Sequence, residues 1–154
     1  MKNSVRLKEV VEAYDMISFE NQVFIDRENG EIVNIFSEYL RKAADEEPYD
    51  RMRDWEQEAM KQAYDIIESE GRFIELSKYD IDEYRIMEKF CYTVADPFKE
   101  EALFNAINGR GAFRRFKDLI YKLEVAEDWY DYKYEAYKQV AREFCEMHHI
   151  SYIE

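Results

Sequence analysis

Residues 23–36 read VFIDRENGEIVNIF, and they set the fold class of the chain. Two runs rich in β-branched and aromatic residues, 23–25 and 32–36, flank the pair Asn29-Gly30. Asn-Gly tolerates the positive φ angles of a tight hairpin turn, and the flanking composition favours strands. The pattern therefore predicts a β-hairpin over residues 23–36.

Outside the hairpin, two short segments are expected to be strands. Residues 72–76 alternate in polarity and predict a third strand, and the tail 150–153 can add a fourth. Helices are expected to start at the N-cap Ser4, within the acidic segment 43–70, after Asp80, at the N-cap Asp96 before Pro97, after Gly111, and at residue 125. The expected fold is α+β and mostly helical: a small antiparallel β-sheet in the N-terminal half, and a helical C-terminal half.

Apolar stripes on these helices predict the core. Three of these stripes are Leu7, Val10, Val11, Tyr14 and Ile17; Trp55, Ala59, Tyr64 (or Ala63) and Ile67; and Phe113, Phe116, Ile120 and Leu123. Gly71 is expected to stop the helix of the acidic segment. The chain has only four glycines and two prolines, with no linker-like stretch. Residues 1–154 are therefore predicted to form a single domain.

The composition describes a strongly acidic, folded chain. The 154 residues hold 22 Lys and Arg against 35 Asp and Glu, a formal net charge of −13. Such a surface repels phosphate, so generic nucleic-acid binding is disfavoured. Aromatic residues make up 16% of the chain, which excludes the composition of a disordered protein.

The acidic charge is densest in residues 43–70, which contain ten acidic residues and only three cationic ones. One interpretation is a solvated helix face. The other is an acidic protein–protein adaptor or nucleic-acid mimic that occupies a basic groove of a partner.

The cysteines and the N-terminal segment indicate a cytoplasmic protein without membrane partners. Cys91 and Cys145 lie far apart and lack CxxC spacing, which fits two buried thiols in a reducing compartment. The opening segment carries Arg6, Lys8 and Glu9 and has no apolar signal core, and no apolar run is long enough to span a bilayer.

Residues 109–117 are the candidate functional segment. Between 109 and 123 there are five cations and one acid, Asp118, within an acidic chain. Glycines that allow close approach, free N–H groups at a helix start and arginines one turn apart can hold a phosphate or carboxylate. The predicted anion-binding residues are Gly109, Arg110, Gly111, Arg114, Arg115 and Lys117. The structural alternative is a tight reversal whose arginines pair with acids such as Glu124, Glu127 and Asp128.

Aromatic residues on the last helix also admit two interpretations. Trp129, Tyr130, Tyr134 and Tyr137 fall into helical stripes, which favours core packing. Alternatively, they form an interface, where tyrosine offers contact area at low entropic cost.

No catalytic motif accompanies these features. The pair His148-His149 lacks the spacing of a zinc site, no serine lies in GxSxG, and no HExxH or calcium-loop pattern occurs. We therefore predict no catalytic residue, no metal site and no cofactor, and the sequence favours a non-enzyme. A metal-assisted hydrolase built from carboxylates that the fold brings together is a remote alternative.

The segment GRGAFRRFKD, residues 109–118, followed by Trp129-Tyr130, resembles the uncharacterised bacterial protein family UPF0158. Residues 77–80, residues 84–87 and the hairpin from Ile25 to Val33 are similar to that family too. The resemblance implies a bacterial cytosolic protein but no activity, and it carries over no catalytic residue.

These observations favour a non-enzymatic cytosolic binding or regulatory module. Its basic segment 109–117 is expected to accept an anionic group of an unknown protein or of a phosphorylated ligand. The competing hypothesis is an adaptor or nucleic-acid mimic that acts through the acidic segment 43–70.

Overall fold

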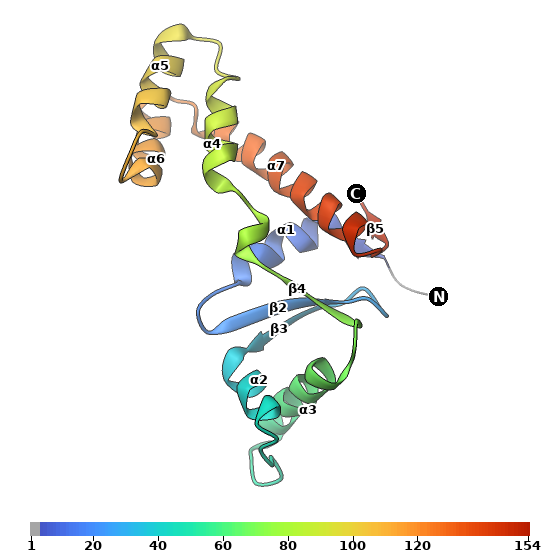
Figure 1. The fold of residues 1–154 in the computed structure, drawn as a ribbon. Helices are drawn as coiled ribbons and strands as arrows, with labels where there is room; N and C mark the ends of the chain where they lie inside the picture. The colour runs from blue at the N-terminus through green and yellow to red at the C-terminus, as the bar shows by residue number, and fades with distance from the viewer. Residues whose placement is uncertain (1–3) are drawn as a thin grey trace. The chain divides into compact units, whose positions relative to one another are not determined.

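A computed structural model describes residues 4–154 (Figure 1). The chain divides into two compact units. Unit 1 contains the chain up to Asp80 together with Val140–Glu154, and unit 2 is Ile81–Gln139. That residues 1–154 form a single domain stays a prediction. The fold class is confirmed: the described residues form seven α-helices and a small antiparallel sheet in the N-terminal half.

The predicted hairpin is confirmed as the centre of unit 1. β2 (Asn21–Asp26) pairs antiparallel with β3 (Ile32–Phe36), with Phe24 opposite Val33. In the turn, Gly30 has a φ of 76°, and Asn29 Oδ1 accepts the N–H of Glu31 at 2.9 Å. The side chain of asparagine and the positive φ of glycine thus close the turn, as the Asn-Gly pair requires.

The third predicted strand is also confirmed. β4 (Phe73–Leu76) pairs antiparallel with β2, so the strand order is β3-β2-β4. An ion pair fixes this end of the sheet, because Arg72 Nη2 lies 2.9 Å from Asp26 Oδ2. Burial alone raises the pKa of the Asp26 carboxyl, but hydrogen bonds from Arg72 and from the N–H of Glu28 outweigh burial and hold that pKa below its ordinary value.

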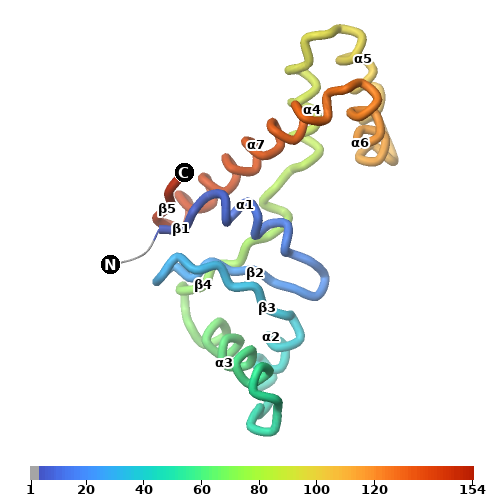
Figure 2. Tube along the Cα trace, turned by 180° about the vertical axis from the view of Figure 1, so that it is seen from behind, coloured from blue at the N-terminus to red at the C-terminus, as the bar shows by residue number. Residues whose placement is uncertain are grey.

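Helices cover both faces of this sheet. Figures 1 and 2 show α1 (Leu7–Met16) on one side, with α2 (Ser37–Ala44) and α3 (Asp54–Glu68) on the other. Residues 23–26 of β2 are therefore all buried. The core on the α2–α3 side contains Phe24, Ile35, Tyr39, Leu40, Ala43, Met60, Ala63 and Ile66.

The structure differs from the prediction at both ends of the chain, which belong to unit 1. Ser4 is not an N-cap, because β1 (Val5–Arg6) precedes α1 and the N-cap is Arg6. β1 pairs in parallel with β5 (Tyr152–Ile153), and the N–H of Val5 donates to the carbonyl of Ser151 at 2.9 Å. The tail is thus a strand, but it forms a separate two-stranded sheet and does not extend the hairpin sheet.

The acidic segment also differs from expectation. Helix α2 was not predicted, and α3 begins only at Asp54. The buried residues of α3 are Met60, Ala63 and Ile66, whereas Trp55 and Ile67 are exposed. The stripe through Trp55 and Ile67 was therefore wrong, although Ala63 was one of its alternatives. Helix α3 ends at Glu68, before Gly71, whose φ is 73°.

Unit 2 is built from helices. They are α4 (Glu83–Cys91), α5 (Pro97–Ala106), α6 (Ala112–Lys122) and the first part of α7 (Ala126–Met147). The predicted cap of α5 is confirmed, since Asp96 Oδ1 accepts the N–H of Phe98 at 2.9 Å. Aromatic rings form the centre of the core: the centroid of Trp129 lies 5.3 Å from Phe90 and 4.8 Å from Phe116.

One prediction for the unit 2 core was wrong. Phe113 is exposed, because the buried stripe of α6 runs through Ala112, Phe116 and Ile120, at four-residue spacing. Among residues 4–154, no helix has both the length and the apolar composition needed to cross a bilayer.

Candidate functional site

The predicted basic segment begins in the turn between α5 and α6. Gly109 and Gly111 both have a φ of 77°, a region that L side chains rarely adopt. Gly111 is the N-cap of α6, and no side chain caps the first N–H groups of this helix. A Cβ atom on Gly111 would lie only 3.0 Å from Arg115 Nη1. The absence of a side chain at Gly111 therefore leaves room for the guanidinium of Arg115. The two glycines therefore allow the reversal that brings Arg115 back onto the turn.

Arg115 is used by the fold. Its Nε donates to the carbonyl of Ala106 at 2.9 Å, and its Nη2 donates to the carbonyl of Asn108 at 2.5 Å. Nη1 donates to the carbonyl of Arg110. One guanidinium thus satisfies three carbonyl groups at and after the end of α5, a role that a cation fills well at a helix C-terminus. This arrangement agrees with the structural interpretation for Arg115, with carbonyls in place of acids as the partners.

The other three cations of the segment have no such partners. Arg110 lies in the turn, and Arg114 and Lys117 lie on α6; all three are exposed. In the part of the chain that the structure describes, no hydrogen bond or ion pair holds any of their side chains. They are therefore available to an external anion.

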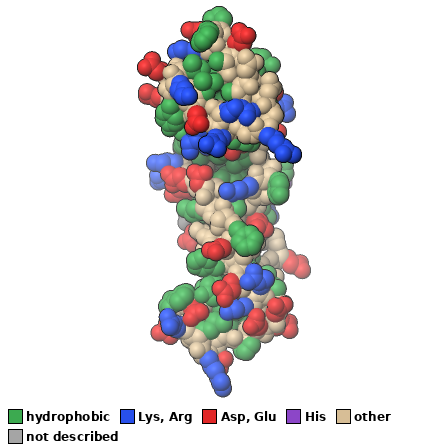
Figure 3. All heavy atoms as spheres, turned by 90° about the vertical axis from the view of Figure 1, so that its left-hand side faces the viewer, with side chains coloured by type: hydrophobic (Ala, Val, Ile, Leu, Met, Phe, Trp, Pro, Cys, Tyr) green, Lys and Arg blue, Asp and Glu red, His purple; other side chains and the backbone are tan. Residues whose placement is uncertain are grey.

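Aromatic side chains share the surface of α6 with these cations. We define the α6 face as Phe113, Arg114, Lys117 and Tyr121. Phe113, Lys117 and Tyr121 follow one another at four-residue spacing, so they form one row along the helix, and Arg114 lies beside it. Lys and Arg side chains gather near exposed hydrophobic side chains on the part of unit 2 that Figure 3 shows.

The predicted interface residues fall into two groups. Trp129 and Tyr137 are buried, which agrees with the core interpretation for these two. Tyr130 and Tyr134 are exposed. The hydroxyl of Tyr130 lies 3.0 Å from that of Tyr121, and this hydrogen bond is the main cause of the raised pKa of Tyr121. Tyr130 thus extends the α6 face onto α7, whereas Trp129 does not belong to it.

The side chains of this surface are of the types that can bind an anionic group. Guanidinium and ammonium groups bind carboxylates and phosphates through charge-assisted hydrogen bonds, and an adjacent phenyl ring packs against the apolar part of the same ligand. Over residues 4–154, no three His, Cys, Asp or Glu side chains are grouped so as to hold a metal ion. The charged groups of the α6 face are the cations of Arg114 and Lys117, and the exposed carboxylate of Asp118 lies four residues after Arg114 on the same side of the helix.

The two cysteines offer little reactivity. Cys91 and Cys145 are buried free thiols. Burial raises the pKa of each thiol to about 11, so the nucleophilic thiolate is scarce near neutral pH.

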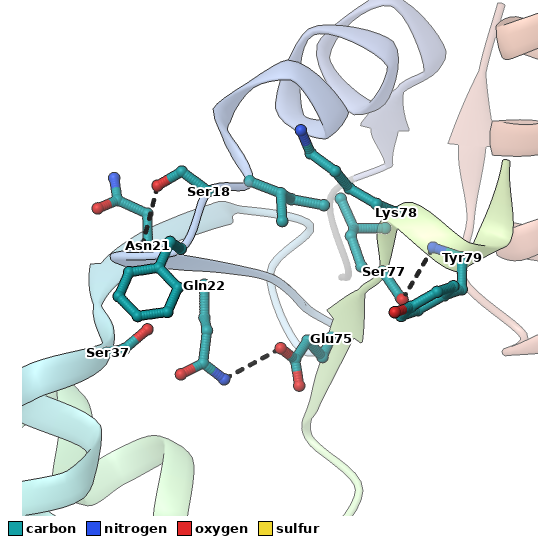
Figure 4. A pocket seen from close by; sticks show the side chains of 11 residues that line it. Ser18, Asn21, Gln22, Ser37, Glu75, Ser77, Lys78 and Tyr79 are labelled. Atoms are coloured by element: carbon teal, nitrogen blue, oxygen red, sulfur yellow. Dashed lines mark hydrogen bonds between the residues drawn. The ribbon is translucent and has the colours of Figure 1, made fainter. Parts of the chain in front are cut away.

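Sequence reasoning missed a polar cavity in unit 1. It has a volume of about 700 Å³ and lies between the start of β2 and the end of β4. Figure 4 shows the amide of Gln22 and the carboxylate of Glu75 pointing toward one another, joined at 3.0 Å. Ser18 and Ser77 also line the cavity, but each hydroxyl accepts a backbone N–H of a local turn. Most of its polar groups thus hold the fold, and no sequence motif marks it.

A second cavity in unit 1, of about 460 Å³, is lined by aromatic rings. Phe19, Phe36, Tyr39 and Trp55 form its apolar walls. The sequence contained one sign of this cavity, the large apolar side chain of Trp55. The incorrect stripe predicted for α3 assigned Trp55 to the core, so the cavity was missed.

The comparison with protein families identifies the chain. The family model described as Uncharacterised protein family (UPF0158) matches residues 3–154, so the chain belongs to this family, as the GRGAFRRFKD segment indicated. No curated protein and no solved structure is detectably similar to it.

Proposed function

We propose that this member of the UPF0158 family is a non-enzymatic binding or regulatory module whose α6 face, together with Arg110 in the preceding turn, accepts an anionic group of a ligand or partner. The observation that carries the proposal is that three cations of this segment are exposed and have no ion-pair partner among the described residues. Arg110, Arg114 and Lys117 are exposed and make no ion pair with the chain's described residues, although the chain has 35 acids. Unpaired cations beside exposed aromatic rings are typical of surfaces that recognise anionic partners.

The backbone at the start of α6 supports the same proposal. The first N–H groups of the helix have no side-chain cap, and glycines at 109 and 111 leave the turn open to close approach. Arg115 holds the turn in place and leaves the ligand contacts to Arg110, Arg114 and Lys117. This division of roles narrows the predicted set of anion-binding residues.

A second candidate function uses the acidic helix. Asp54, Glu58 and Asp65 are exposed on α3, and Asp54 directly precedes the exposed Trp55. These residues favour an acidic adaptor that binds a basic partner. Such a complex would be lost when the three acids are neutralised and would be insensitive to changes on α6.

Thermal unfolding at low salt tests the proposed anion site. The probes are pyrophosphate, a nucleoside triphosphate, a short acidic peptide and a short oligonucleotide. A ligand present at about a hundredfold its dissociation constant stabilises the folded state by about 2.7 kcal/mol, which raises Tm by roughly 5–10 °C. We expect a shift with at least one probe for the parent chain and none for Arg114→Glu/Lys117→Glu.

Two controls separate binding from folding. Lys8→Glu makes the same kind of charge change at an exposed position on α1 and should keep the ligand-induced shift. The double variant without ligand should have a Tm close to that of the parent, because neither side chain makes a hydrogen bond or an ion pair with the described residues. A ligand-induced shift that survives in the double variant, or no shift with any probe, contradicts the proposal.

We extend the proposal to a bacterial cytosolic location. Two thiols that are both buried and unpaired support it, because a reducing compartment keeps cysteines in this state. Fractionation of bacterial cells that express the protein at its natural level tests the location.

A further inference from the structure

The second cavity of unit 1, which we term the aromatic cavity, exposes three large rings. Phe19 is 100% exposed, Trp55 is 59% exposed and Phe36 is 51% exposed, and all three line the same 460 Å³ cavity. Single exposed hydrophobic residues are ordinary, but three large rings around one hollow expose a contiguous apolar patch. Such patches mark interaction sites.

The charge around the cavity restricts what binds there. Glu20 and Glu38 also line it, with Arg41 as the single cation in the lining. Beyond Trp55, the outer surface of α3 carries the exposed acids Glu58 and Asp65; Glu58 also pairs with the exposed Lys61 of the same helix, at 3.3 Å. The cavity and this acidic surface together form what we term the α3 surface. Its complement is a basic segment that presents an aromatic ring.

The α6 face has this composition. Phe113 is 51% exposed, and Arg114 and Lys117 lie one position and one turn further along the helix. We propose that the α6 face of one copy of this chain docks on the α3 surface of a second copy. Phe113 enters the aromatic cavity against Trp55, and the cations meet the acids of α3. This inference rests on the proposed function, since it names the anionic partner of the α6 face.

Size and charge predict a weak association. The eleven residues of α6 span only about 16 Å, so the contact falls at the small end of specific interfaces. Two copies of net charge −13 also repel each other. At 0.1–0.15 M salt the Debye length is roughly 8–10 Å, which screens this long-range repulsion more than it screens ion pairs in contact.

Sedimentation and fluorescence of the full chain test the inference. Sedimentation velocity at about 0.15 M salt, from about 1 μM to about 1 mM protein, brackets a weak interface. The chain has two tryptophans, and Trp129 is only 5% exposed. A concentration-dependent blue shift of the emission therefore reports the burial of Trp55. We expect both the mass and the blue shift to increase together.

Charge reversal identifies the surfaces. Arg114→Glu/Lys117→Glu and Glu58→Lys/Asp65→Lys should each weaken self-association at least tenfold when measured alone. An equimolar mixture of the two variants should associate, because each then presents the complement of the other. Lys8→Glu is the matched control, since it reverses an exposed charge on α1, outside both surfaces, and should leave self-association unchanged.

Each outcome decides the inference. A parent chain that stays monomeric over the whole range overturns it, as does a mixture of the two variants that fails to associate. If the parent stays monomeric but an acidic peptide still raises its Tm through Arg114 and Lys117, the proposed function stands and only the self-docking falls. If no anionic probe binds and no association occurs, both fail.

Discussion

Nε of Arg115 donates to the backbone carbonyl of Ala106 at 2.9 Å, so one side chain ties the first turn of α6 to the end of α5. Arg114 precedes it directly and makes no comparable contact in the described structure. Two adjacent arginines of the GRGAFRRFKD segment therefore have different roles: one builds the turn, and the other is presented by it.

Substitution separates these roles. Arg115→Gln should lower the free energy of unfolding by about 1–2 kcal/mol, because three carbonyls lose a charged donor, whereas Arg114→Gln should change it by less than about 0.5 kcal/mol. Urea unfolding of both variants measures the difference. Equal effects on stability would show that the hydrogen bonds of Arg115 do not hold the turn.

The corrected stripe of α3 gives a second prediction. Met60 is completely buried and Trp55 is exposed, although the sequence placed Trp55 in the core. Met60→Ala should therefore cost about 2–5 kcal/mol of stability, whereas Trp55→Ala should cost less than about 1 kcal/mol despite the larger volume removed. Thermal unfolding at the same low micromolar concentration compares the two variants. The opposite order would restore the original stripe.

Acid sensitivity should depend on Asp26. Its folded pKa lies below the unfolded value of about 3.9, so its contribution to stability is complete above the unfolded pKa and is lost as pH falls through the folded pKa. Asp26→Asn should lose about 1–3 kcal/mol at pH 7, and the gap to the parent should narrow below about pH 4. Urea unfolding at both pH values measures the gap.

Glu28→Gln is the matched control for Asp26. Glu28 also pairs with Arg72, at 3.3 Å, but its side chain is exposed. The loss of the Glu28 carboxylate should leave the free energy of unfolding nearly unchanged at both pH values. A gap between Asp26→Asn and the parent that stays constant with pH would exclude Asp26 as the titrating group.

The cysteines should react slowly with thiol reagents. A pKa of about 11 in place of 9.0 leaves about a hundredfold less thiolate at pH 8, and burial restricts access further. Labelling should be much slower in the native chain than in urea. Ser4→Cys supplies an exposed thiol as the internal control. Native cysteines that react as fast as this control would contradict the buried positions.

Local signals allowed much of the fold to be predicted. The Asn29-Gly30 turn, the alternation before Leu76 and the Asp96-Pro97 cap each act within a few residues, and the structure confirms all three. The paired ends of the chain were not predictable in this way. Val5 and Tyr152 become neighbours only when the whole of unit 1 has folded, so the helix start assigned to Ser4 was wrong.

The candidate site was also predictable from the sequence only in part. The basic segment is visible in the sequence, because five cations within fifteen residues contrast with the acidic rest of the chain. Which cations are available is not visible there, since the answer depends on where the carbonyls of the α5–α6 turn lie. The aromatic cavity was hidden as well, because a ring on an amphipathic helix looks the same whether it faces the core or the solvent.

The sequence by itself determined the class of the fold, the position of its turns and caps, and the contrast between an acidic chain and one basic segment. These features depend on backbone preferences and on charge, which act locally. Only the tertiary structure decided that Met60 is buried while Trp55 is exposed, that Arg115 serves the fold, and that Arg114 faces the solvent. Those assignments depend on which face of each helix packs against its neighbours, and packing is a property of the whole chain.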